Sequence, residues 1–186
     1  MSADTSPPRA APRSPGRIAP RALDLVRPPA ERDEAAPRRS GARSPFELLR
    51  CEHLRLAGLL YRAESATHRS GRAQAFAELI RELDIHDQVE ERIFYPALRQ
   101  EEETRDITLD SYDQHRSVRR LVEELSALDA GDPRWPARLA LLSYRLQRHM
   151  ADEEQRLFAQ AQITLSRTRL AKLAVRMAAE RRRLSA

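Results

Sequence analysis

Four histidines, two of which are followed four residues later by a glutamate, are the residues of this sequence best suited to chemistry. The set consists of His53, His86, Glu90, His115, His149 and Glu153. Residues four apart on an α-helix project from the same face, so each His-x-x-x-Glu pair would direct an imidazole nitrogen and a carboxylate toward one point. Imidazole and carboxylate groups brought together in this way are typical of a metal site.

The intervals between the four histidines match the length of a helix and its connection. They measure 33, 29 and 34 residues. Four helices that each turn one histidine inward would place the histidines around a common point in the core of a bundle. The sequence therefore predicts a metal centre built from four helices.

Apolar residues around these positions repeat at helical spacing. Ser44-Pro45-Phe46-Glu47 forms a capping box, which predicts that the first helix begins there. This helix is expected to end near residues 67–71, so His68 falls in a loop and has no predicted metal role. In the second helix Pro96 is expected to bend or end the helix near Tyr95, and the residues on its inward face are 76, 79, 83, 86, 90 and 94.

The second half of the chain continues this pattern. A third helix is predicted over residues 108–130, after a solvated connection over residues 101–106. Asp132 and Pro133 are expected to open the fourth helix, with Asp132 as its cap. A fifth helix, basic and amphipathic, is predicted from Leu165 to Arg183.

Composition also favours helices, because the chain has only 5 Gly, 5% aromatic residues and much Ala, Leu, Arg and Glu. The length of 186 residues suits one domain with tails. Eight of the 12 prolines lie in residues 1–43, a composition typical of disorder. We therefore predict an all-α fold, with a disordered Pro/Arg-rich tail over residues 1–43, a four-helix bundle over residues 44–162 and a basic C-terminal helix over residues 163–186.

The net charge of +5 is unevenly distributed. Basic residues are in excess in both tails, whereas acidic residues are in excess in the domain between them. The pI of about 10.1 therefore does not make the domain a nucleic-acid binder. Cys51 is the only cysteine, which excludes an intramolecular disulfide. No apolar run reaches the length of a signal peptide or a membrane span, and we expect a cytoplasmic protein.

The chemistry of the six residues narrows the choice of metal. A carboxylate is rarely buried without a partner, and for Glu90 and Glu153 that partner is either a metal cation or an arginine. Four imidazoles and two carboxylates suit iron, manganese, zinc or copper. Six ligands exceed the four of a tetrahedral zinc site and suit two metals that share carboxylates.

The order His, His-x-x-x-Glu, His, His-x-x-x-Glu resembles the hemerythrin-like, or HHE cation-binding, domain. The similarity includes the surroundings of both glutamates, residues 90–98 and 153–158, and spans roughly residues 45–160. The resemblance implies an antiparallel four-helix bundle that holds two non-haem iron ions, with manganese or zinc as the alternatives. It further implies that His53 and His86 bind one iron, that His115 and His149 bind the other, and that Glu90 and Glu153 bridge them.

One position departs from the family pattern. Hemerythrins that carry oxygen have a further histidine four residues after the third, where this chain has Arg119. The second iron would then have an open position, which favours a reaction over storage of oxygen. Asp87 is the candidate substitute ligand, because some iron-sensing members use an acid directly after the second-helix histidine. Glu91 and Glu154 are expected to be surface charges, and Tyr112 to pack in the core, with a hydrogen bond to a bound ligand as its alternative role.

Three kinds of function follow from this reading. The first is a di-iron protein that binds oxygen, nitric oxide or peroxide and acts in sensing or stress response. The second is a di-iron enzyme that breaks down peroxide or nitric oxide or repairs iron-sulfur centres. The third, ranked last, is an interaction protein whose Arg-rich ends bind nucleic acid or an acidic partner. An oligomer formed through the C-terminal helix is compatible with all three, whereas binding to nucleic acid or to a membrane is not expected.

Overall fold

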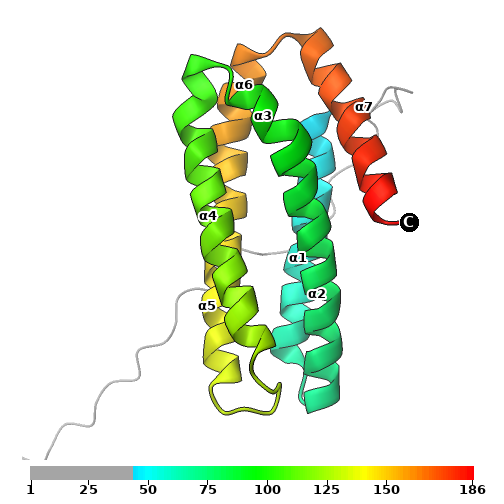
Figure 1. Cartoon of the computed structure of the whole chain (residues 1–186), viewed down its shortest axis with the longest axis vertical. Coiled ribbons are helices and arrows are strands. Elements are labelled where there is room, and N and C mark those ends of the chain that lie inside the picture. The colour runs from blue at the N-terminus through cyan, green and yellow to red at the C-terminus, as the bar shows by residue number, and fades with distance from the viewer. Residues whose placement is uncertain (1–43) are drawn as a thin grey trace, which may run out of the picture. The chain divides into compact units, whose positions relative to one another are not determined.

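The computed structural model describes residues 44–186, so the disordered tail predicted over residues 1–43 lies outside the part described. Every regular element of the described part is helical (Figure 1). The elements are α1 (Pro45–Ser65), α2 (Arg69–Val89), the π turn η1 (Glu90–Phe94), α3 (Tyr95–Leu98), α4 (Glu102–Ser126), α5 (Trp135–Asp152), the π turn η2 (Glu153–Leu157), α6 (Phe158–Thr164) and α7 (Arg167–Leu184).

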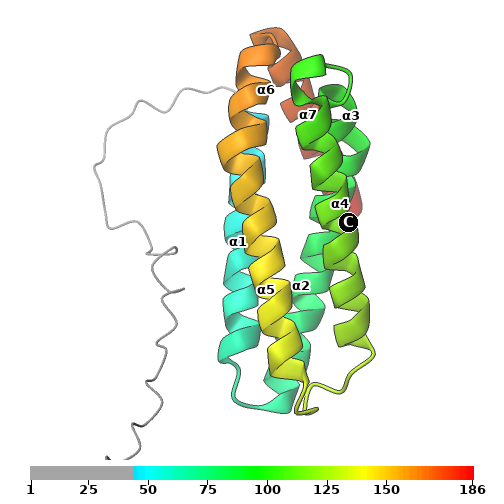
Figure 2. The same cartoon turned by 90° about the vertical axis from the view of Figure 1, so that its left-hand side faces the viewer.

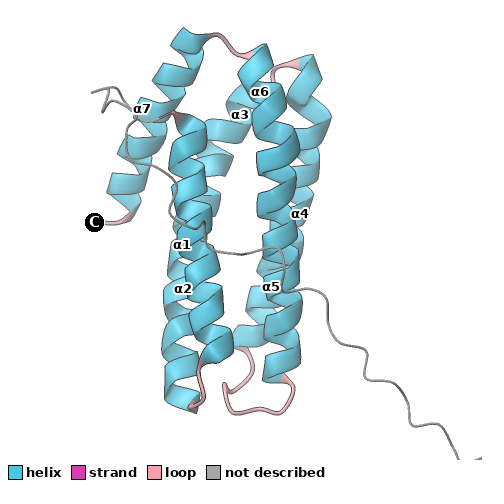
Figure 3. Cartoon of the chain, turned by 180° about the vertical axis from the view of Figure 1, so that it is seen from behind, coloured by secondary structure: helices cyan, strands magenta, loops and turns pink. Residues whose placement is uncertain are grey.

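Four helical columns form an antiparallel bundle. α2 continues through η1 into α3, and α5 continues through η2 into α6, so each series forms one long column beside α1 and α4 (Figures 1 and 2). Short connections join the columns at the two ends of the bundle, as the loops in Figure 3 show. The predicted all-α bundle with an additional C-terminal helix is confirmed within residues 44–186.

The capping box at the start of α1 forms as predicted. Oγ of Ser44 accepts the backbone N–H of Glu47 at 3.1 Å, and the carboxylate of Glu47 accepts the N–H of Ser44 at 2.9 Å. This reciprocal pair satisfies free donors of the first helical turn. It therefore fixes the phase in which α1 presents Leu49, His53 and Leu56 to the core, where all three are buried.

Two apolar clusters pack the interior on either side of the predicted centre. One lies toward the α1–α2 and α4–α5 connections and includes Leu60, Leu79, Leu125, Trp135 and Leu142. The other lies toward the opposite end and includes Phe46, Phe94, Phe158, Leu173 and Met177. Along each column, the predicted ligands fall between these clusters, so apolar side chains enclose the polar centre at both ends.

The additional helix α7 lies against α1, α2 and η1 (Figure 1). Leu173, Ala174 and Met177 on its apolar face are at most 4% exposed. These residues pack α7 onto the bundle, so the helix predicted from Leu165 to Arg183 is present and amphipathic. None of the described helices is both long enough and apolar enough to cross a membrane.

Two helix starts differ from the sequence prediction. α4 begins at Glu102 rather than near residue 108, because Glu102 and the glutamate after it lie in its first turn, where negative charge interacts favourably with the helix dipole. α5 begins at Trp135, and the carboxylate of Asp132 instead accepts the N–H of Arg134 at 2.8 Å in the preceding turn. Asp132 therefore shapes the connection and does not cap the helix.

Pro96 does not end its helix near Tyr95, because the helical column runs on to Leu98. Pro96 lies in the first turn of α3, directly after the π turn η1. Its missing N–H falls where the α-helical series of hydrogen bonds is already interrupted, so the proline is accommodated.

Candidate metal centre

The six residues predicted as metal ligands meet inside the bundle. Each of the four columns contributes one histidine, and each column with a π turn adds a glutamate at the first position of that turn. Their exposed fractions are at most 3%. The side chains brought together are those of His53, His86, Glu90, His115, His149 and Glu153.

The inward nitrogens of the histidines face the two glutamates. Nε2 of His86 and Nε2 of His115 each lie 3.3 Å from Oε2 of Glu90. Nε2 of His53 and Nε2 of His149 lie 3.3 Å and 3.6 Å from Oε2 of Glu153. These atoms form two compact ligand groups that share Glu90, one of His53, His86, Glu90 and Glu153 and the other of Glu90, His115 and His149.

Unpaired polar atoms are concentrated in this centre. Among the described residues, the buried side-chain atoms without a hydrogen-bond partner are Nε2 of His53, Nε2 of His86, Oδ1 of Asp87, Oε1 of Glu90 and Oε2 of Glu153. A buried polar atom without a partner costs about 1–3 kcal/mol. Within residues 44–186 the ion-pair partners of Glu90 and Glu153 are histidines and not arginines. The orphaned atoms and the imidazole–carboxylate set therefore fit a metal cation.

Burial and neighbouring charges shift the pKa values of these groups in opposite directions. Burial lowers the pKa of His149 to about 3 and raises the pKa of Glu90. Burial also opposes protonation of His53 and His115, but their carboxylate partners outweigh it and raise the two pKa values to about 9 and about 10. A metal that binds here must displace any proton from the imidazole nitrogens that it coordinates.

The outward nitrogens of the four histidines are held by a ring of polar side chains. In each case Nδ1 bonds to an oxygen from another column: His86 to Glu52 at 3.0 Å, His115 to Glu91 at 2.9 Å, His149 to Gln114 at 2.9 Å and His53 to Glu154 at 2.7 Å. An Nδ1–H that donates to such a partner fixes the orientation of the imidazole and reserves Nε2 for the centre.

The partners in this ring follow the order of the columns along the chain, and the last column supplies the partner of the first. α1 supplies the partner of the histidine on α2, and the α2 column supplies the partner of the histidine on α4. α4 then supplies the partner of the histidine on α5, and the α5 column supplies the partner of the histidine on α1. The orientation of each imidazole therefore depends on the rotational setting of two columns.

Glu91 and Glu154 are partly exposed, at 27% and 34%, but each carboxylate also bonds to a buried imidazole, a role that was not predicted. Glu52 and Gln114, the other two partners, had no predicted role. All four stand directly beside an inward residue in the sequence. One step along a helix rotates a side chain by about 100°, which turns these residues toward the adjacent column. An acid or amide next to an inward ligand is the signal that could have identified them.

Tyr95 adds a hydroxyl to the centre that the sequence spacing did not predict. Its Oη lies 3.0 Å from Oε2 of Glu90, 2.7 Å from Oε1 of Glu153 and 3.2 Å from Nε2 of His115. The side chain of Tyr95 is fully buried. Tyr112 packs edge-on against it with ring centroids 5.0 Å apart, so the predicted packing role of Tyr112 is confirmed.

The two π turns explain how Tyr95 reaches the centre. They begin at Glu90 and Glu153, the glutamates of the two His-x-x-x-Glu pairs. A π turn is wider than an α turn, because its hydrogen bonds join residues five apart, and such turns are frequent at functional sites. The N–H of Tyr95 bonds to the carbonyl of Glu90 in this way, and the side chain of Tyr95 returns to the face that carries Glu90.

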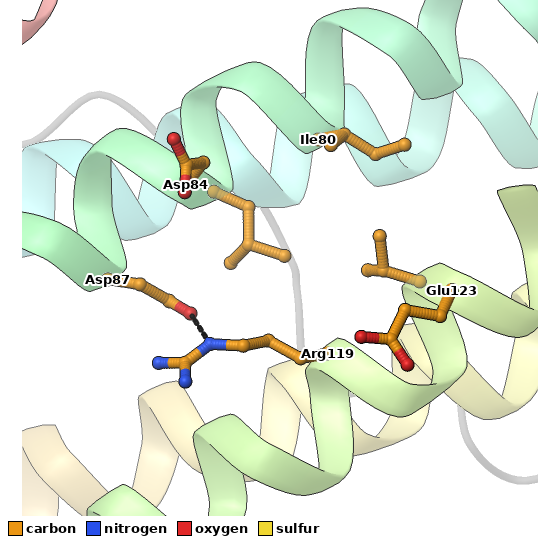
Figure 4. Close-up of a pocket in the computed structure, with 7 residues that line it drawn as sticks. Ile80, Asp84, Asp87, Arg119 and Glu123 are labelled. Atoms are coloured by element: carbon orange, nitrogen blue, oxygen red, sulfur yellow. Dashed lines mark hydrogen bonds and ion pairs between the residues drawn. The ribbon is translucent and has the colours of Figure 1, made fainter.

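A pocket of about 170 Å³ opens between α2 and α4 (Figure 4). Its lining residues are Ile80, Leu83, Asp84, Asp87, Arg119, Val122 and Glu123. Nε of Arg119 donates to Oδ2 of Asp87 at 3.3 Å, and the same guanidinium pairs with Glu91. Oδ1 of Asp87 lies 3.7 Å from Nε2 of His115. The candidate ligand Asp87 thus stands between the pocket and the centre.

Two known proteins resemble the chain. A protein named DNA nickase from Nostoc sp. is 24% identical over 123 residues, which are 64% of this chain and 34% of that protein. The chain thus spans about a third of the length of this relative. The crystal structure of a hemerythrin HHE cation-binding domain-containing protein from Mycobacterium kansasii superposes with a TM-score of 0.69 at 23% identity, covering 76% of this chain and 87% of that one. This likeness shows a shared fold.

The family comparison covers the bundle and its centre. Residues 44–161 match the family model described as the hemerythrin HHE cation-binding domain. The matched range contains all four columns and the six buried residues that converge between them. The chain therefore belongs to the hemerythrin HHE cation-binding domain family, and its bundle is a metal-binding domain.

Proposed function

We propose that the chain is a non-haem di-iron protein that binds oxygen, nitric oxide or peroxide and acts in sensing or in the response to stress. The observation that carries this proposal is the set of buried, unpaired atoms on His53, His86, Glu90 and Glu153, which lie in two overlapping ligand groups. Membership of a cation-binding family supports a bound metal. Two groups that share one glutamate favour two ions over one. The proposal includes the cytoplasmic setting expected from the sequence.

The ligand types favour iron. A set of imidazoles and carboxylates suits iron, and six ligands exceed what one tetrahedral zinc ion accepts. Bound iron would supply a change of oxidation state and a coordination position for a small ligand. In this proposal His53, His86, Glu90 and Glu153 hold one ion, and Glu90, His115 and His149 hold the other.

The residues around the ligands support a reactive or sensing centre. Tyr95 holds a proton at Oη, between the carboxylates of Glu90 and Glu153. The apolar clusters at both ends of the centre limit the entry of water. Arg119 stands where oxygen carriers of the family have a histidine, and it pairs with Asp87 instead of facing the centre. This arrangement favours a centre in which ligand binding leads to a reaction or a signal, rather than a centre that carries oxygen reversibly.

The proposal is tested by the metal content of protein purified without added metal, together with absorption spectra before and after reduction and exposure to air. About two iron ions per chain would agree with the two ligand groups. Spectra that change on reduction and on exposure to air would agree with a redox-active centre. A chain that holds no metal, and takes up none from ferrous iron under anaerobic conditions, would refute the proposal.

An enzyme that uses the same centre is the second candidate, favoured by the proton donor Tyr95 beside both glutamates. Many turnovers of peroxide or nitric oxide per chain, lost in Glu90→Ala, would support the enzyme. Binding of one ligand per centre without turnover would support the sensor. The activity named in the Nostoc relative, DNA nickase, is not favoured here, because a DNA backbone could not reach ligands that are at most 3% exposed.

A further inference from the structure

The C-terminal helix α7 reaches the metal centre through one arginine. α7 lies beyond residues 44–161, which match the family domain. Nη1 of Arg181 on this helix lies 3.3 Å from Oε1 of Glu52, and Nη2 lies 2.7 Å from Oε2 of Glu82. The other oxygen of Glu52 bonds to Nδ1 of His86 at 3.0 Å. Arg181, Glu52 and His86 thus form a continuous series of contacts from α7 to the centre.

These contacts become more enclosed toward the centre. The side chain of Arg181 is 19% exposed, that of Glu52 is 8% exposed and that of His86 is fully buried. Two other outer carboxylates also pair with arginines, but those arginines, Arg50 and Arg119, are 48% and 45% exposed. Since water screens exposed ion pairs, the pair formed by Arg181 is the least screened of the three.

We propose that Arg181 is a positioning residue for the metal centre, acting on His86 through Glu52, and that it couples the packing of α7 to the retention of metal. The proposal rests on iron binding at the centre but not on the identity of the small ligand. The guanidinium holds Glu52 as an oriented carboxylate, which in turn accepts from Nδ1–H of His86. A carboxylate in this position fixes the imidazole ring and makes Nε2 a stronger metal ligand.

The rest of α7 keeps Arg181 in place. Met177 and Leu173 are buried against the bundle, about one and two turns before Arg181. Glu180, the residue next to Arg181, accepts a hydrogen bond from Arg92 of η1 at 3.0 Å. Because coupling between two binding events is reciprocal, metal bound at the centre must also favour the packed position of α7.

The direct test is the rate at which iron-loaded, full-length protein loses metal to excess chelator. Arg181→Ala is expected to lose iron about tenfold faster than the wild type, the lower end of the usual effect of outer-partner mutations. Arg181→Lys keeps the charge without the two-pronged contact and is expected to lie between them. The matched control is Arg182→Ala, since Arg182 is exposed and forms no ion pair within the described residues. Its rate is expected to equal that of the wild type.

A double-mutant cycle separates the proposed route from a general loosening of α7. Glu52→Gln breaks the series of contacts between Arg181 and His86, so Arg181→Ala should add no further acceleration in that background. Hydrogen exchange of the α7 amides should also slow when the wild type is loaded with iron. If Arg181→Ala does not fold, Arg181→Lys and Glu52→Gln provide the same comparison.

Each outcome decides between the proposals. Equal release rates for Arg181→Ala and Arg182→Ala, or full acceleration by Arg181→Ala in the Glu52→Gln background, would overturn the role of Arg181 while leaving the di-iron proposal intact. A wild-type chain that takes up no iron would overturn both. Accelerated release that depends on Glu52 would confirm the coupling of α7 to the centre.

Discussion

Oη of Tyr95 lies 2.7 Å from Oε1 of Glu153, and both side chains are closed to solvent. Glu153 belongs to the α5 column and Tyr95 to the α2 column, so this hydrogen bond crosses the centre. The same hydroxyl lies 3.0 Å from Oε2 of Glu90. A single phenol therefore links the two carboxylates that the metal site would use.

Tyr95→Phe is expected to destabilise the metal-free protein by about 1–3 kcal/mol, because it leaves buried carboxylate oxygens without their donor. The loss should be smaller in the iron-loaded protein, where the metal neutralises the same oxygens. Unfolding in urea, measured for both forms, checks this difference. Tyr61→Phe is the control, since Tyr61 is 70% exposed. An equal loss in the two forms would contradict a role of the hydroxyl in meeting the carboxylate charge.

His149→Ala is expected to lose metal and to lower the melting temperature. Removal of this imidazole takes away a metal ligand, and loss of the metal leaves the buried carboxylates of Glu90 and Glu153 without their cation, which destabilises the folded protein. Metal analysis and thermal unfolding measure the two effects. His68→Ala, at an exposed position outside the centre, should change neither. Unaltered metal content in His149→Ala would remove His149 from the ligand set.

Glu154→Ala is expected to weaken metal binding by about tenfold or more, although Glu154 contacts no other part of the centre than Nδ1 of His53. Loss of this acceptor frees the imidazole to rotate. Competition with a chelator of known affinity measures the change. Glu64→Ala removes a glutamate from the exposed side of α1 and should leave the affinity unaltered. The same affinity in both variants would mean that the ring of outer partners does not tune the ligands.

Val122→Phe is expected to slow the binding of small ligands without lowering metal content. The larger side chain would occupy the pocket between α2 and α4, whose inner wall is Asp87 (Figure 4). Stopped-flow mixing of nitric oxide with the reduced protein would measure the rate. Leu141→Phe enlarges a residue of α5 that is 39% exposed and serves as the control. Identical rates would place the entry route elsewhere in the molecule.

The positions of the six central residues could be predicted because a step of four keeps a side chain on one face of a helix. The π turns were not predicted, yet the sequence contains a signal for them. Residues 86, 90 and 94, and again residues 149, 153 and 157, advance by two successive steps of four. An α-helix has about 3.6 residues per turn, so a repeated step of four indicates a wider turn. The role of Tyr95 follows from that turn.

The outer partners could not be assigned from one helix at a time. Whether Glu91 faces water or His115 depends on how the α2 column and α4 are rotated relative to each other. The spacing of residues within either helix does not determine that rotation. The contact between Arg181 and Glu52 likewise joins segments that are far apart in the sequence. The disorder predicted for residues 1–43, and the binding of a partner by that tail, stay predictions.

The ring of outer partners also has a consequence for handedness. A bundle with the same helices arranged in the opposite rotational sense could bury nearly the same apolar residues. In that mirror arrangement, Glu52 would face the α5 column, and His86 would lose the acceptor of its Nδ1 proton. All four imidazoles would be affected in the same way, because every partner comes from the preceding column. The polar ring thus selects one handedness of the bundle, a choice that hydrophobic packing alone leaves nearly degenerate.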